Sequence, residues 1–146
     1  NGDIEETDLL SLLKRYQMQD ATTVLGAVPA SSRQATLQDA DLFIFPSHYN
    51  NEAQPLVVLE AMAAGVPVIA TDIATLPEFV QHNATGFLCP PKDPARLAKM
   101  IKHAIHSPTK VTNMRDDAYK LCCETFSQDK FADHLVELVH DVVEKR

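Results

Sequence analysis

The chain has little positive charge and no long uninterrupted apolar run. Its 146 residues include 13 basic and 20 acidic side chains, for a net charge of -7, and no basic cluster exceeds a Lys-Arg pair. This balance argues against a surface that binds nucleic acid or anionic lipid. The longest apolar run, residues 55–70, is interrupted by Glu60, Gly65 and Pro67 and falls short of a membrane span. We therefore expect a soluble protein.

Metal-binding patterns are also missing. Cys89, Cys122 and Cys123 lack the spacing of a metal site, and two of them are neighbours on a predicted helix. None of the six histidines is paired with a cysteine or aspartate in a way that builds such a site. We predict reduced core thiols and no metal bound to protein. No secretory signal pattern is seen, so we expect a cytoplasmic location.

Composition is that of a globular protein with a real core. Hydrophobic residues make up 45% of the chain and charged residues 23%, which predicts one domain over residues 1–146. The chain begins with Asn1 rather than Met, and we expect it to be part of something longer.

Strand-like and helix-like patterns alternate along the chain. Short β-branched or apolar runs predict strands at 22–28, 41–46, 67–73 and 86–89. Helical periodicity predicts helices near 9–16, 31–40, 55–64, 77–82, 93–106, 108–125 and 128–145. Such alternation, with strands apolar on both faces, predicts an α/β fold: a Rossmann-like parallel sheet with helices on both faces. The last helix carries an apolar stripe, which we expect to pack on a core: Phe131, Leu135, Leu138, Val139 and Val142.

Glu60 is the only charged residue between residues 53 and 71. A helix that is apolar all round is buried, and burying an unpaired carboxylate is costly unless something donates hydrogen bonds to it. We expect Glu60 to be largely buried and a ligand to supply those donors. Glu52 precedes it by eight residues, in the loop that leaves the strand 41–46, and so reaches the crevice where doubly wound sheets bind ligands. Pro55 suits the first helical position, and the free amides after it favour a phosphate.

Several segments together resemble the nucleotide-binding half of retaining family 4 glycosyltransferases. They are Ala-Asp-Leu-Phe-Ile-Phe-Pro-Ser at 40–47, Glu-Ala-Gln-Pro-Leu-Val-Val-Leu-Glu-Ala-Met-Ala-Ala-Gly-Val-Pro-Val-Ile-Ala-Thr-Asp at 52–72, Leu-Pro-Glu at 76–78, Thr-Gly-Phe-Leu at 85–88 and Pro-Pro-Lys-Asp-Pro at 90–94. The resemblance implies a GT-B architecture, two Rossmann-like domains with the active site between them, of which this chain supplies the donor-binding domain.

The resemblance also implies roles for individual residues. Glu52 matches a glutamate near the donor sugar and its scissile bond, and Glu60 matches one that accepts hydrogen bonds from the ribose hydroxyls. Gln54, with the backbone amides of Leu56 and Val57, would lie against the sugar and diphosphate. Val28 matches a position whose backbone touches the base. Two departures from the family pattern could alter which sugar is accepted: Ala-Gln at 53–54 in place of Gly-Phe, and Ala-Thr at 74–75 in place of Gly-Gly.

The implied activity is transfer of a hexose, with retention of anomeric configuration, from a UDP- or GDP-linked sugar to an acceptor. No further cofactor is implied. The acceptor, a saccharide or a lipid-linked group, would be held by an absent N-terminal domain. Alternatives are a nucleotide-sugar epimerase or phosphorylase of the same architecture, or a non-catalytic remnant that serves as an interaction module.

In the family, two strands and an Arg and a Lys that clamp the diphosphate precede the start of this chain. We therefore expect the fragment alone to be inactive. The strands at 22–28 and 41–46 would each lose a neighbour in the sheet. Either they pair directly with each other, or another chain or an omitted segment completes the sheet.

Overall fold

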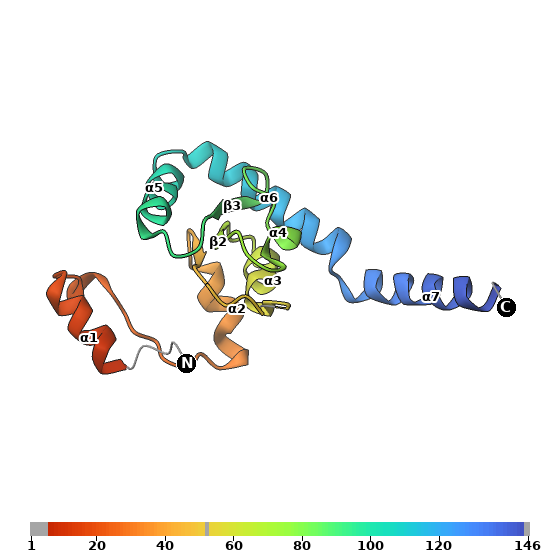
Figure 1. The fold of residues 1–146 in the computed structure, drawn as a ribbon, viewed down its shortest axis with the longest axis horizontal. Coiled ribbons are helices and arrows are strands. Elements are labelled where there is room, and N and C mark those ends of the chain that lie inside the picture. The colour runs from red at the N-terminus through yellow and green to blue at the C-terminus, as the bar shows by residue number, and fades with distance from the viewer. Residues whose placement is uncertain (1–5, 52, 145–146) are drawn as a thin grey trace. The chain divides into compact units, whose positions relative to one another are not determined.

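Three apolar segments form a parallel sheet (Figure 1). The strands are β1 (Phe43–Phe45), β2 (Val68–Thr71) and β3 (Gly86–Cys89), hydrogen-bonded in the order β1-β2-β3. Every residue of β2 is buried, as expected for a central parallel strand covered on both faces. This computed structural model describes residues 6–51 and 53–144. Among these residues, β1 pairs with β2 alone and is an edge strand.

Helices connect and cover the strands. Those from residue 30 onward are α2 (Ala30–Gln38), α3 (Leu56–Ala63), α4 (Leu76–Phe79), α5 (Pro94–Ile105), α6 (Pro108–Thr125) and α7 (Gln128–Glu144). The predicted bounds of β3 and α6 match the structure residue for residue. The other elements from residue 30 onward are present where expected and are slightly shorter or shifted at their ends, where hydrogen-bond patterns are weakest.

Two apolar clusters lie on opposite faces of the sheet. Val68 and Ala70 of β2 belong to one cluster, and Ile69 between them belongs to the other. Helices α2, α3, α4 and α6 add buried residues to the first cluster: Leu37, Val58, Ala61, Met62, Leu76, Phe79, Ala118 and Cys122. Phe87, opposite Ile69, joins Ala104 of α5 and Met114 of α6 in the second. The predicted Rossmann-like arrangement, with helices on both faces of a parallel sheet, is confirmed.

The described residues divide into two compact units, one up to residue 30 and one from Ser31 onward. The first contains α1 (Glu6–Arg15) and a short 3-10 helix, η1 (Gln19–Ala21). The strand predicted at 22–28 is wrong, because no strand forms there. Thr22, Thr23 and Val24 favour extended backbone, but a strand also needs a neighbour to accept and donate its ladder hydrogen bonds.

The sheet-edge prediction has two parts. The expectation that the 41–46 segment lacks a neighbour is confirmed for the described residues, since β1 has β2 on one side only. Direct pairing of 22–28 with 41–46 is ruled out, since 22–28 is not a strand. Completion of this edge by another chain or segment remains a prediction.

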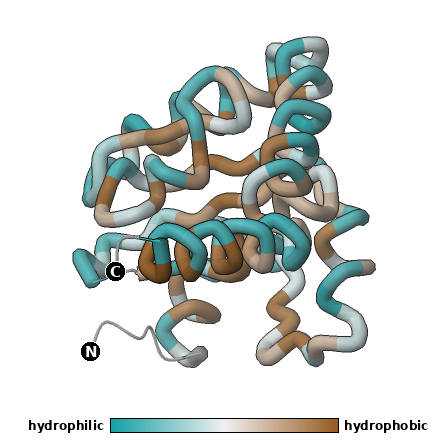
Figure 2. The backbone as a smooth tube through the Cα atoms, turned by 90° about the vertical axis from the view of Figure 1, so that its right-hand side faces the viewer, coloured by the Kyte–Doolittle hydropathy of each residue, from teal (hydrophilic) through white to brown (hydrophobic). Residues whose placement is uncertain are grey.

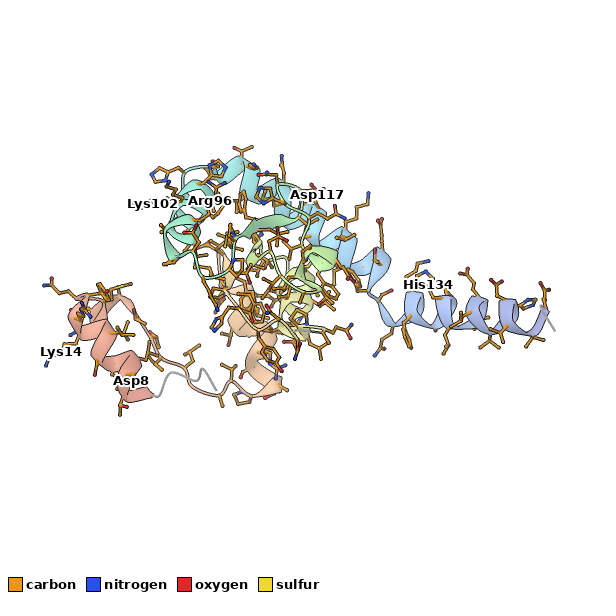
Figure 3. All side chains as sticks on the ribbon, in the orientation of Figure 1. Asp8, Lys14, Arg96, Lys102, Asp117 and His134 are labelled. Carbon is orange, nitrogen blue, oxygen red and sulfur yellow. The ribbon has the colours of Figure 1, made fainter. Side chains whose placement is uncertain are left out.

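Helix α7 does not pack on a core. Hydrophobic positions recur along one side of the helix that leads to the C-terminus (Figure 2), yet none of its described residues is buried. Its side chains, His134 among them, project without described side chains from other elements of the same compact unit beside them over most of its length (Figure 3). The expectation that the stripe packs on a core is therefore wrong for the described residues. No helix among them is long and apolar enough to cross a membrane.

Candidate functional site

The loop between β1 and α3 lies at the carboxyl ends of the strands. Two threonines anchor this loop, one at the end of β2 and one shortly after it. The Thr71 hydroxyl donates to the Ser47 carbonyl, and the Thr75 hydroxyl donates to the Ala53 carbonyl at 2.8 Å. Thr71 is the last residue of β2, so the start of the loop is fixed to the end of the central strand. These bonds hold the two sides of the loop at the edge where doubly wound sheets bind ligands.

Helix α3 rises directly from this loop. Pro55 is its buried N-cap rather than its first helical residue, a shift of one position from the prediction. The first-turn amides, including those of Leu56 and Val57, have no partner within a helix and carry its positive dipole end. The helix stops where Gly65 adopts a φ of 70°, with its N–H donating to the Met62 carbonyl at 3.0 Å. An α3 of eight residues therefore starts at the crevice and carries Glu60 in its second turn.

The prediction that Glu60 is largely buried is wrong, because the residue is only half-buried. Its side chain is 36% exposed, and its Oε1 accepts a hydrogen bond from Nη1 of Arg33 on α2 at 2.6 Å. The other oxygen, Oε2, is buried and accepts no hydrogen bond from the described residues. The sequence pattern assigned the compensating donor to a ligand, but the chain itself supplies one for Oε1. Arg33 lies 27 residues upstream, and no motif connects it to Glu60.

The other predicted site residues are distributed as follows. Gln54 and Leu56 are exposed beside the N-terminus of α3, and Val57 is half-buried. Val28 belongs to the first unit, and Glu52 lies outside the described residues. The structure thus groups Gln54, Leu56 and Val57 at the start of the helix that carries Glu60. The roles of all six residues remain predictions.

A small cavity of about 140 Å³ opens at the carboxyl ends of the sheet. Pro46, Thr71 and Cys89, which end or follow the three strands, line it together with Lys92. Burial raises the pKa of the Cys89 thiol, and the carboxylate of Asp93 raises it further. Cys89 is a buried free cysteine that forms part of the cavity wall.

A larger cavity of about 350 Å³ lies elsewhere, where α5 and α6 meet Asp41 and Leu42. Asp41 and Leu42 precede β1, so this cavity sits at the amino end of that strand. Ligands of doubly wound sheets bind at the opposite, carboxyl end. Despite its size, this second cavity is therefore the weaker candidate.

Metal ligands do not converge anywhere in the described part of the chain, where no group of three or more His, Cys, Asp or Glu side chains could hold an ion. His82, a candidate by residue type, accepts a hydrogen bond from the Leu88 amide through Nδ1 at 2.9 Å. This bond fixes the turn before β3 to the strand itself. His82 has a structural role.

Ala74 adopts a φ of 47°, a left-handed conformation that glycine adopts without cost. This is one of the two positions where the resembling family carries Gly-Gly. Holding a residue with a Cβ atom in this conformation costs about 1 kcal/mol. Thr75, next in the chain, uses its side chain to hold the loop carbonyl of Ala53. Thr75 thus anchors the site loop.

Residues 2–121 match the family of glycosyl transferases group 1. This chain belongs to that family. A similar curated protein is the amylovoran biosynthesis glycosyltransferase AmsK of Erwinia amylovora, 31% identical over 104 residues, which are 68% of this chain and 25% of AmsK. The chain spans about a quarter of the length of the first curated relatives it matches.

Solved structures of this family's fold superpose closely on this group 1 glycosyl transferase chain. Sucrose-phosphate synthase from Thermosynechococcus elongatus matches 97% of it with a TM-score of 0.84 and 25% identity, over 35% of the synthase. Anabaena Alr3699/HepE, in a complex with UDP-glucose, matches 94% with a TM-score of 0.81 and 22% identity, over 38% of that protein. The predicted family and its GT-B glycosyltransferase fold are confirmed.

Proposed function

We propose that this group 1 glycosyl transferase chain binds the donor of a retaining hexosyltransferase, a UDP- or GDP-linked sugar. The observation that carries the proposal is the buried Oε2 of Glu60, which has no hydrogen-bond partner among the described residues. It belongs to a helix that starts at the carboxyl ends of parallel strands. A ribose hydroxyl would satisfy this oxygen. The likeness to a protein in complex with UDP-glucose supports the same class of ligand.

The donor's parts are assigned along α3. Glu60 accepts the ribose hydroxyls, and the first-turn amides of Leu56 and Val57 hold the diphosphate, where the helix dipole favours negative charge. Gln54, exposed just before the helix, contacts the sugar. Val28 provides backbone contact with the base. This order places the sugar end of the donor beside the loop that contains Glu52.

Glu52 orients the donor sugar near its scissile bond in this proposal. Catalysis rests on holding donor and acceptor in line and on stabilising the charge that develops on the departing diphosphate. The helix N-terminus of α3 supplies part of that stabilisation through its amides. The reaction uses no metal bound to protein and no cofactor beyond the donor, and the product keeps the anomeric configuration of the donor.

The acceptor is a saccharide or lipid-linked group, and we propose that a second domain outside these 146 residues binds it in the cytoplasm. The curated relatives are about four times as long as the part that this chain matches, which leaves room for such a domain. This division of labour requires the activity to be tested on the natural full-length protein.

Calorimetric titration of the full-length protein with UDP and GDP tests the proposal. Glu60→Ala is expected to weaken nucleotide binding by about 1–3 kcal/mol, the scale of hydrogen bonds to a charged group. Glu52→Ala is expected to lower turnover with little change in nucleotide affinity. Glu124→Ala is the matched control, because this glutamate of α6 is 63% exposed. Unchanged affinity in Glu60→Ala would remove the ribose assignment, and NMR of the product's anomeric proton tests retention.

A further inference from the structure

The carboxylate of Glu60 has two unlike oxygens. Oε1 accepts a charge-assisted hydrogen bond from the Arg33 guanidinium at 2.6 Å. Oε2 is buried without a partner among the described residues, although the side chain as a whole is 36% exposed. The exposed part of Glu60 is thus not this second oxygen. A carboxylate accepts about four hydrogen bonds, so the pair with Arg33 leaves capacity unfilled.

Arg33 and Glu60 come from different helices, α2 and α3, of the same compact unit. The Arg33 side chain is itself 42% exposed, so it is not a core residue that folding requires to be covered. Its position restricts the rotamers of Glu60 by fixing one of the two oxygens. The pair therefore orients the carboxylate before any ligand arrives.

Charge gives this pair a consequence for nucleotide binding. A ribose offers hydroxyl donors but no positive charge, and a nucleotide that covers Glu60 removes water from an anion. The diphosphate of the same nucleotide adds negative charge nearby, in a chain whose net charge is already -7. Without a counter-charge, the loss of water from Glu60 and the repulsion between negative charges both oppose binding. Arg33 supplies that counter-charge next to the carboxylate.

We propose that Arg33 is a positioning residue for the nucleotide: it fixes and neutralises Glu60 so that Oε2 can accept a ribose hydroxyl. This inference rests on the proposed function of Glu60. Because Oε2 is closed to solvent in the free chain, the hydroxyl reaches it only after a local movement of the side chains around it. Arg33 keeps the carboxylate in place during that movement.

The test measures UDP and GDP affinity by calorimetry on the natural full-length protein and four variants. Arg33→Leu is expected to raise the Kd about five- to twenty-fold, and Arg33→Lys is expected to restore it to within about threefold of the original protein. Arg33→Gln keeps donors without charge and is expected to lie near Arg33→Leu. Lys120→Leu is the matched control, because it removes a cation that is 70% exposed on α6, and it should change the Kd less than twofold.

A double variant separates positioning from a general effect on folding. In the Glu60→Gln background, Arg33→Leu is expected to change the Kd less than about twofold, because a neutral amide needs no counter-charge. An equal loss in both backgrounds would assign Arg33 a merely structural role and overturn the inference. Unchanged or tighter binding in Arg33→Leu would overturn it as well. If the original protein binds neither nucleotide, the proposed function itself fails. If Glu60→Gln weakens nucleotide binding and Arg33→Leu does not, only the role of Arg33 is contradicted.

Discussion

Helices α6 and α7 are nearly equal in length, at 18 and 17 residues, and both carry an apolar side. The two differ in what covers that side. Helix α6 buries Met114, Ala118 and Cys122, and contributes to the clusters on both faces of the sheet. Helix α7 buries no described residue, and its apolar side chains remain exposed: Phe131, Leu135, Val136, Leu138, Val139, Val142 and Val143. Amphipathic periodicity thus specifies a face but does not specify its partner.

The largest expected difference between the helices comes from truncating one apolar side chain on each. Met114→Ala in α6 is expected to lower the free energy of unfolding by about 2–5 kcal/mol, because Met114 is fully buried and its removal leaves a cavity. Leu138→Ala in α7 is expected to change it by no more than about 0.5 kcal/mol, because Leu138 is 62% exposed. Urea unfolding of the 146-residue chain, followed by circular dichroism, measures both. A loss above about 1 kcal/mol for Leu138→Ala would show that α7 is packed in solution.

A smaller difference is expected from the polar contacts of the two helices. Arg115 of α6 donates through Nε to the Gly65 carbonyl at 2.8 Å, just after the end of α3. Arg115→Ala is expected to cost about 0.5–1.5 kcal/mol. Lys130 of α7 lies 3.6 Å from Asp133, with both side chains about half exposed or more, and Lys130→Ala should cost about 0–0.5 kcal/mol. Equal losses in the same unfolding measurement would contradict the comparison.

The smallest expected effect on stability comes from two adjacent cysteines on α6, one on its buried side and one on its exposed side. Cys122 is buried and its thiol contacts the Leu59 carbonyl at 3.7 Å, whereas the adjacent Cys123 is exposed. Burial raises the pKa of Cys122 above its ordinary value of 9.0, and Cys123 raises it further. The raised pKa stabilises the folded state below pH 9.0, and this contribution is lost as the pH rises toward the folded-state value.

The free energy of unfolding should therefore fall between about pH 8 and about pH 10, and it should fall less in Cys122→Ala than in the original chain. Iodoacetamide should label Cys123 first, and labelling of Cys122 should follow unfolding. Equal labelling rates for the two thiols in the folded chain would mean that this side of α6 is not covered.

The sequence predicted much of the site because its signals there are local. Gly65 ends α3 through its backbone conformation, and Pro55 precedes the helix whichever residue is counted as its first. The loop after β1 was expected at the carboxyl ends of the strands, and Thr71 and Thr75 hold it there. By contrast, Arg33 could not be predicted as the partner of Glu60. It lies on another helix, and helical periodicity around Arg33 carries no information about residues 27 positions away.

By itself, then, the sequence determined the class of fold, the run of strands from β1 to β3 and the helix that carries Glu60. These follow from periodicity and from the conformational limits of Gly and Pro, which act within a few residues. Only the tertiary structure decided that 22–28 forms no strand, that α7 stays uncovered and that Glu60 pairs with Arg33. Each of these depends on whether a second segment is present to supply hydrogen bonds, apolar surface or opposite charge, and that is a property of distant contacts.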